Sequence, residues 1–198
     1  MPEEILFIIA SYLLGSIPFG FLIVRLTSGK DIRDLGSGNI GATNVLRSKG
    51  KMAALFTLLF DVAKAAIPII YGRAHFDSPV LIMAGGAAAI IGHMFPLFLK
   101  FRGGKGVSTL AGVFLVMDLR VLGVFLAVFV TVIIASRFVS LGSISGAVAV
   151  FFAVLFTNLA EVAVLVLLVV ILIILRHRSN IQRLIAGNEN RLSLDRNG

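Results

Sequence analysis

Residues 5–24 read ILFIIASYLLGSIPFGFLIV, a run without a charged side chain. A helix that crosses the hydrocarbon core of a bilayer needs about 20 mostly apolar residues, so this stretch is long enough to span a membrane. Neither a basic segment nor a small-residue cleavage site accompanies it, which indicates a retained span and not a secretion signal. The run therefore predicts an integral membrane protein.

The composition of the whole chain supports the same class. Of 198 residues, 58% are hydrophobic and only 14% are charged, which is far more apolar than a soluble domain of this size. Cysteine is absent, which excludes disulfides, thiolate catalysis and cysteine-ligated metals. Apolar runs lie at residues 5–24, 52–71, 80–101, 107–117, 121–136, 141–157 and 162–175. The sequence therefore predicts an all-α integral membrane protein, a single polytopic domain over residues 1–198 with seven transmembrane helices.

The fourth run, residues 107–117, is shorter than the others. As a helix it extends about 16 Å, which is less than the hydrocarbon core of a bilayer. Either the helix starts earlier, near Gly103, or the preceding glycine-rich loop enters the membrane. Irregular backbone is tolerated at that depth only where protein or water satisfies it, so the short run indicates a polar site below the membrane surface.

Seven crossings would place alternate connections on opposite sides of the membrane. Lysine and arginine are divided unequally between these two sides. One side carries 15 of these cations, and the other carries only Arg73 and Arg120. Cytoplasmic connections are enriched in Lys and Arg, so the N-terminus is predicted to lie outside and the C-terminus in the cytoplasm. The 15 cations are Arg25, Lys30, Arg33, Arg47, Lys49, Lys51, Lys100, Arg102, Lys105, Arg137, Arg176, Arg178, Arg183, Arg191 and Arg196.

The first polar stretch begins at residues 36–44, which read GSGNIGATN, and continues to Arg47. Glycines allow successive backbone N–H groups to converge on an anion, while hydroxyl and carboxamide groups add hydrogen bonds. The spacing GxGxxG is present, but no strand of a soluble sheet precedes it, so a dinucleotide fold is rejected. The stretch is predicted to bind phosphate where the next helix opens, and a plain interhelical turn is the alternative. Its candidate residues are Gly36, Ser37, Gly38, Asn39, Gly41, Thr43, Asn44 and Arg47.

The second polar stretch is residues 92–109, GHMFPLFLKFRGGKGVST. Its glycines around Lys105 resemble a phosphate loop in composition, but the pattern GxxxxGK[ST] is absent, so ATP hydrolysis has no support. For His93, a role in the site and a role as a hydrogen-bonding residue in helix packing are equally supported. Lys100 fits binding to anionic lipid headgroups better than a role in the site. The candidate residues are His93, Arg102, Gly103, Gly104, Lys105 and Ser108.

The third polar stretch is residues 176–190, RHRSNIQRLIAGNEN. His177 and Asn180 are three residues apart and are expected on one helical face, and the unperturbed pKa of histidine suits proton transfer near neutral pH. Arg178 and Arg183 fit a positive-inside anchor, while Asn188 and Glu189 are weaker candidates. Asp61 and Lys64 form one more charged pair, inside the second span, and we interpret them as a structural ion pair although charges in a span are often functional.

The three stretches resemble the three motifs of the bacterial acyl-phosphate:glycerol-3-phosphate acyltransferases. The resemblance covers essentially the whole chain in span number, motif order and motif side. It implies a membrane enzyme that makes lysophosphatidic acid and phosphate from acyl phosphate and sn-glycerol 3-phosphate, in the first acylation of phospholipid synthesis. It implies no cofactor and no metal, a place in the bacterial cytoplasmic (inner) membrane with the site facing the cytoplasm, and contact with membrane lipid. Neither nucleic acid nor an obligate protein partner is expected.

The residues fit direct transfer of the acyl group. An acyl phosphate is an activated mixed anhydride, so the protein needs only to position the hydroxyl and stabilise charge. Neither a His-x4-Asp pair nor a Ser-His-Asp triad is supported by the spacing of acidic residues. One phosphate is assigned to Ser37, Asn39, Thr43 and nearby backbone, and the other substrate to Arg47, Lys105, His177 and Asn180. The base is either His177 or a phosphate oxygen of the donor.

Two other classes use similar residues. A transporter for an organic phosphate needs the same cations, but it also predicts polar side chains towards the outer side, where this chain has few. A CDP-alcohol phosphotransferase requires clustered aspartates for metal ions, and the chain lacks such a cluster.

Overall fold

The computed structural model describes residues 1–192, and all of their regular secondary structure is helical. Arg196, one of the cations used to predict orientation, lies outside the described residues. Contacts between residues divide the chain into two compact units, residues 1–119 and 120–198, which are described separately below. An all-α architecture, as predicted, is confirmed.

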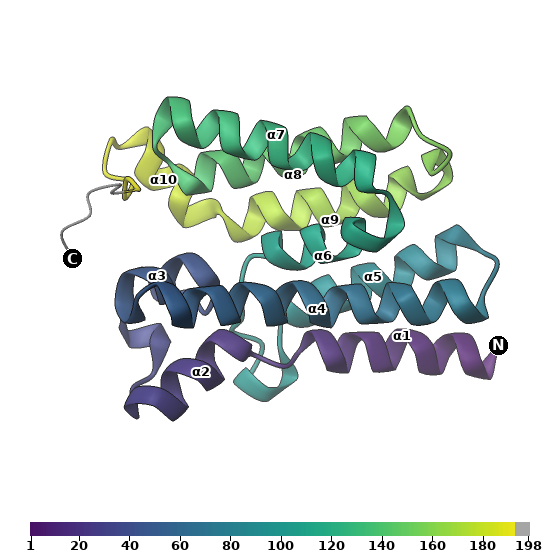
Figure 1. The fold of residues 1–198 in the computed structure, drawn as a ribbon, viewed down its shortest axis with the longest axis horizontal. Coiled ribbons are helices and arrows are strands. Elements are labelled where there is room, and N and C mark those ends of the chain that lie inside the picture. The colour runs from purple at the N-terminus through teal and green to yellow at the C-terminus, as the bar shows by residue number, and fades with distance from the viewer. Residues whose placement is uncertain (193–198) are drawn as a thin grey trace. The chain divides into compact units, whose positions relative to one another are not determined.

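The first unit contains α1 to α6 (Figure 1). Its helices and short 3₁₀ turns are α1 (Pro2–Gly15), α2 (Phe19–Ser28), η1 (Ile32–Asp34), α3 (Ala42–Lys49), α4 (Lys51–His75), α5 (Pro79–Met94), η2 (Leu97–Leu99) and α6 (Val107–Met117). The second unit contains α7 (Leu119–Ser136, from its second residue), α8 (Val139–Leu155), η3 (Ala160–Val162), α9 (Ala163–Arg176) and α10 (Arg178–Ile185).

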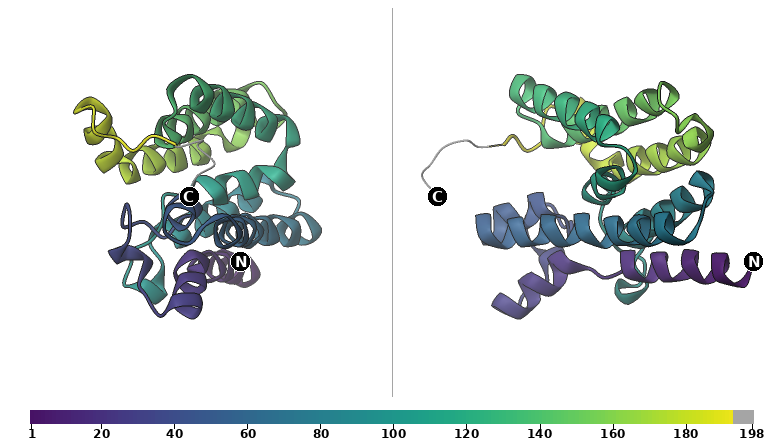
Figure 2. Two further views of the ribbon diagram at one scale, coloured as in Figure 1. Left: turned by 60° about the vertical axis from the view of Figure 1, so that its left-hand side comes forward. Right: turned by 45° about the vertical axis from the view of Figure 1, so that its right-hand side comes forward.

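The first apolar run is one membrane segment but not one continuous helix. α1 ends at Gly15 and α2 begins at Phe19, because Pro18 has no N–H to continue the helical ladder. The change of direction between α1 and α2 is visible from two further sides in Figure 2. α2 leads through the short turn η1 into the first polar stretch.

Close backbone approaches hold the helices of the first unit together. Gly15 of α1 lies against Ala89 of α5, and Gly112 of α6 lies against the backbone of Val62 in α4. In each case a side chain at the glycine would collide with backbone of the neighbouring helix. Small residues of this kind allow the close helix contacts that drive packing in membranes, where the hydrophobic effect between helices is lost.

Within residues 1–192, four helical segments are long and apolar enough to cross a bilayer: Pro2–Ser28, Lys51–His75, Pro79–Leu99 and Leu119–Ser136. A fifth is the bent pair Ala160–Arg176 and Arg178–Ile185, whose parts meet at 56°. α6 and α8 are shorter apolar helices. α6 begins at Val107, so the alternative of a start near Gly103 is wrong, and the glycine-rich residues before it form an irregular loop. Seven crossings and the orientation of the termini stay predictions.

Candidate active site

Asn44 organises the loop of the first polar stretch. Its side chain is 2% exposed, and its Oδ1 accepts a hydrogen bond from the backbone N–H of Ser37 at 2.8 Å. Its Nδ2 faces the carbonyl oxygens of Ile32, Leu35 and Asn39 at 3.2, 2.9 and 2.8 Å. The carboxamide therefore closes residues 32–44 into a compact loop, and this role was not anticipated when Asn44 was predicted to contact phosphate.

Glycine and a second carboxamide complete the loop. Gly36 and Gly38 have φ values of 55° and 71°, which favour residues without a Cβ, and a side chain at Gly36 would collide with Asn44. Asn39 accepts a hydrogen bond from the N–H of Gly41 at 3.1 Å, an Asx turn that leads into α3. The predicted phosphate ligands then lie at the rim: Ser37 is exposed, Thr43 is half-buried in the first turn of α3, and Arg47 is exposed one turn later.

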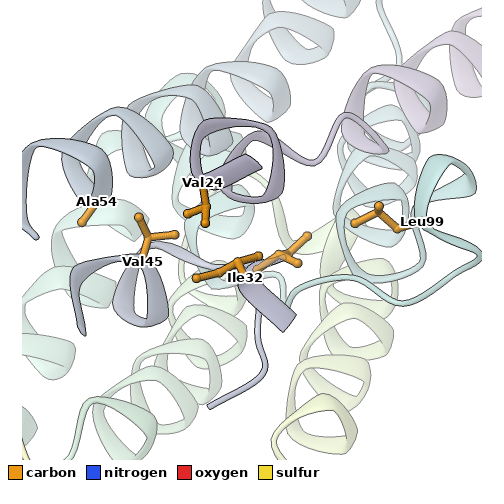
Figure 3. Close-up of a cluster of buried hydrophobic side chains, with 6 residues drawn as sticks. Val24, Ile32, Val45, Ala54 and Leu99 are labelled. Atoms are coloured by element: carbon orange, nitrogen blue, oxygen red, sulfur yellow. The ribbon is translucent and has the colours of Figure 1, made fainter. Parts of the chain in front are cut away.

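A small apolar cluster anchors both polar stretches of the first unit. It contains Ile32, Ile40 and Val45 around the first loop, together with Leu99 from the second stretch; Val24 and Ala54 complete it. Figure 3 shows side chains from α2, η1, α3, α4 and η2 gathered in this cluster. Because the two stretches share one buried anchor, the structure brings them together although its members Ile40 and Leu99 are 59 positions apart in the chain.

The second loop folds back onto the end of α5. The N–H groups of Gly103 and Gly104 donate to the carbonyl oxygens of Met94 and His93 at 3.2 and 2.9 Å. A side chain at Gly103 would collide with the same carbonyls, and one at Gly104 would collide with the His93 ring. Both glycines are therefore required by close packing, which holds Lys105, half-buried, immediately before α6.

The start of α6 is set by Gly106, whose φ is 87°. Thr109 donates to the carbonyl oxygen of Gly106 at 2.9 Å, while Ser108 is half-buried in the first turn. Arg102 is exposed at the other end of the loop. The arrangement places a cation, a hydroxyl and a helix N-terminus next to one another, as a site for an anion requires.

His177 lies at the bend between α9 and α10 in the second unit. It is 2% exposed, and its Nδ1 is 2.8 Å from the carbonyl oxygen of Ile173. A carbonyl can only accept, so Nδ1 carries the proton, and in the neutral ring Nε2 has the lone pair. The structure thus defines which ring nitrogen of His177 is able to accept a proton.

Glu189 is the centre of the third stretch. Its Oε1 accepts hydrogen bonds from Asn180 at 2.7 Å and Ser140 at 2.8 Å, and its Oε2 pairs with Arg183 at 2.7 Å. Burial acts to raise the pKa of Glu189, but these hydrogen bonds and the charge of Arg183 outweigh it and hold the pKa below its ordinary value. Asn180 is therefore oriented by a carboxylate and linked through it to α8.

Comparison with known proteins identifies the family. Residues 5–187 match the family model described as glycerol-3-phosphate acyltransferase. The chain is 47% identical to the glycerol-3-phosphate acyltransferase of Syntrophotalea carbinolica, over 96% of this chain and 98% of that protein. It is 42% identical to the one from Macrococcus caseolyticus, over 93% and 94% of the two chains. The chain belongs to the glycerol-3-phosphate acyltransferase family.

The fold of this acyltransferase is similar to two crystal structures of PlsY (YgiH), an integral membrane glycerol 3-phosphate acyltransferase. For the glycerol 3-phosphate form the TM-score is 0.91 at 36% identity, with 96% of each chain covered. For the lysophosphatidic acid form the TM-score is 0.87 at 34% identity, with the same coverage. The family inferred from the three motifs and the membrane class inferred from the apolar composition are confirmed.

Two residues of the acyltransferase matter more than their local sequence suggests. Glu189 seemed a weak candidate, and Ser140 was not considered, because the contact between them joins positions 49 residues apart. Arg178 is exposed, as an anchor to the membrane surface would be. His177 and Asn180 belong to the second unit and the two glycine-rich loops to the first, so a joint site of all three stretches stays a prediction. Within residues 1–192, no group of three His, Asp or Glu side chains could hold a metal ion.

Proposed function

We propose that this acyltransferase takes its acyl group from acyl phosphate and passes it directly to the 1-hydroxyl of sn-glycerol 3-phosphate. The hydroxyl oxygen forms the new ester bond with the acyl carbon, and the bond from that carbon to the phosphate oxygen breaks. The hydroxyl proton passes to a phosphate oxygen of the donor, or to Nε2 of His177. The products are lysophosphatidic acid and phosphate, and no acyl-enzyme forms.

The hydrogen bond from His177 to the carbonyl of Ile173 carries the argument for direct transfer. In a Ser-His-Asp triad the same ring nitrogen donates to a carboxylate, which stabilises the imidazolium that forms when serine attacks. Here Nδ1 is 2.8 Å from a neutral carbonyl, while Glu189, the carboxylate of residues 176–190, is engaged by three other side chains. This arrangement supports an enzyme that does not rely on an activated protein nucleophile.

Two anionic substrates account for the polar loops. We assign Ser37, Asn39, Thr43 and the backbone of residues 36–41 to one phosphate, and Arg47 and Lys105 to the charge of the other substrate. Asn44 holds the backbone of this loop in place through its side-chain hydrogen bonds. Preorganised donors of this kind supply catalysis mainly by orientation and by stabilising developing charge. The excess of cations on one set of connections supports a site that faces the cytoplasm from a bacterial inner membrane.

The test uses purified protein in detergent with palmitoyl phosphate, glycerol 3-phosphate and a chelator. We expect lysophosphatidic acid to form, and we expect palmitoyl-CoA in place of palmitoyl phosphate to give none. Product from palmitoyl-CoA alone, or no product with donors of several chain lengths, would overturn the proposed donor.

Variants in the same assay examine the assigned residues. Ser37→Ala and Lys105→Ala should each lower kcat/KM by about 100-fold or more, the usual scale for losing a group that stabilises charge in the transition state. The exposed Lys30→Ala should stay at the wild-type level and serves as the matched control. His177→Ala tests whether His177 is the base. Near-normal turnover of this variant at saturating substrate would show that a phosphate oxygen of the donor accepts the hydroxyl proton.

A further inference from the structure

Three ionisable side chains are buried together inside the first unit. The ion pair expected between Asp61 and Lys64 on α4 is present, with Lys64 Nζ 2.8 Å from Asp61 Oδ1 and both side chains 1% exposed. His93 of α5 adds a third member, because its Nδ1 lies 3.6 Å from the same oxygen and its side chain is 3% exposed. Asp61 is therefore contacted by Lys64 of its own helix and by His93 of α5.

Lys64 connects Asp61 to the break between α1 and α2. Its Nζ donates to the carbonyl oxygen of Ile17 at 2.7 Å and lies 5.7 Å from the centre of the Phe19 ring, within cation–π range. Ile17 immediately precedes Pro18, where the first membrane segment changes direction. The start of α2, which leads into the first polar loop, is thus held by a cation that Asp61 orients.

His93 connects Asp61 to the second polar loop. Its backbone carbonyl accepts the N–H of Gly104 at 2.9 Å, and its ring lies where a side chain at position 104 would be. Lys105 is the next residue. A shift of the His93 ring would therefore displace the backbone that carries Lys105.

The geometry of Asp61 suits a role in positioning Lys64 and His93 better than a role in stabilising the fold. Among residues 1–192, no group donates a well-directed hydrogen bond to either oxygen of Asp61, so the carboxylate is held by the proximity of Lys64 and His93. A buried ion pair is a weak source of stability, because desolvation offsets the attraction of the charges. What the pair does supply is a fixed placement of Lys64, which contacts the break before α2, and of His93, which contacts the second polar loop.

We propose that Asp61 is a positioning residue for acyl transfer: through Lys64 and His93 it sets the start of α2 and the backbone of residues 103–105. The inference rests on the acyltransferase activity of the family. Wild-type protein in the same assay separates the two ideas, because inactive wild type would speak against the proposed donor, and active wild type with unaffected variants would speak against positioning.

The decisive variant is the double substitution Asp61→Leu with Lys64→Met. It replaces the ion pair by apolar side chains of similar size, a change that often leaves stability equal or higher. We expect the thermal unfolding midpoint in detergent to stay at the wild-type value. We expect kcat/KM to fall by about 100-fold, which is the usual loss when a group of the active site is displaced by about 1 Å. The KM for glycerol 3-phosphate should rise, whereas a loss of folded protein alone would lower the apparent kcat and leave KM unchanged. Wild-type kcat and KM in this variant would overturn the proposal.

Two single substitutions keep the test valid if the double variant does not fold. Asp61→Glu retains a carboxylate and should keep more activity per folded molecule than Asp61→Asn, which leaves the charge of Lys64 uncompensated. Hydrogen exchange at residues 100–106 should accelerate in Asp61→Asn. The exposed Asp77→Asn is the matched control and should match wild type in both measurements. Asp61→Asn with activity equal to or above Asp61→Glu, or with unchanged exchange at residues 100–106, would overturn the proposal.

Discussion

Asn44→Asp tests whether the first loop works as a preformed support for phosphate. The substitution keeps the size of the side chain and the acceptor for Ser37 N–H, but it replaces the Nδ2 donor by an oxygen. That oxygen would face the carbonyls of Ile32, Leu35 and Asn39, which now lie 2.8 to 3.2 Å from Nδ2. An Asn44→Ala change would also remove the acceptor for Ser37, so the aspartate variant is the more selective probe.

The size of the effect follows from these contacts. Two N–H donors are lost at a site that is 2% exposed, and leaving buried polar groups unpaired costs about 3 kcal/mol in total. If the loop must be ordered to bind phosphate, this cost appears as a loss of about 100-fold in kcat/KM. The protein should remain folded, because the buried packing of the helices is unchanged.

The assay combines steady-state kinetics with hydrogen exchange. Asn44→Asp should raise the KM for the substrate held by this loop and accelerate exchange at residues 36–44, while exchange in α4 and α5 stays slow. Asn158→Asp makes the same chemical change at an exposed turn and should match wild type. Wild-type kcat/KM together with wild-type exchange in the loop would refute the idea that the Asn44 carboxamide organises the site.

Two further predictions concern other parts of the site. Gly104→Ala adds a methyl group where the His93 ring lies, and overpacking of this kind costs about 1–3 kcal/mol. We therefore expect kcat/KM to fall by about 10-fold or more and the unfolding midpoint to fall by about 2–12 °C; unaltered kinetics would contradict the packing seen here. Glu189 contributes stability above its ordinary pKa of 4.5, and this is lost as pH falls through the lower pKa of the folded state. The protection of the amides of residues 178–192 against hydrogen exchange, taken relative to the intrinsic exchange rate at each pH, should therefore fall at acidic pH in wild type but not in Glu189→Gln. Equal pH profiles of this protection would show that the carboxylate does not hold this segment.

The bounds of the membrane helices are close to those of the apolar runs in the sequence. They differ where a particular residue interrupts the helix. The run at residues 107–117 predicts α6, and the structure has Val107–Met117. The run at residues 5–24 reads as one span, but Pro18 divides it into α1 and α2. His177 lies at the bend between α9 and α10 and caps α10, the helix that contains Asn180, so a shared face for the two side chains stays a prediction.

Side-chain roles are harder to predict than motif positions. Residues 36–44 are predicted to be a functional loop, but sequence cannot distinguish a carboxamide that binds substrate from one that binds the loop itself, as Asn44 does. Glu189 depends on Ser140, which is distant in the chain and carries no local signal. The link from Asp61 to His93 joins α4 to α5, and it too follows from packing and not from spacing.

The central claim, direct transfer from acyl phosphate, is tested most directly by a single-turnover experiment. Enzyme in excess over palmitoyl phosphate is held without acceptor, glycerol 3-phosphate is then added, and phosphate and lysophosphatidic acid are measured over time. Direct transfer predicts no phosphate release before the addition and equal amounts of both products after it. A burst of phosphate before glycerol 3-phosphate is present, followed by lysophosphatidic acid when it is added, would reveal an acyl-enzyme and contradict the account.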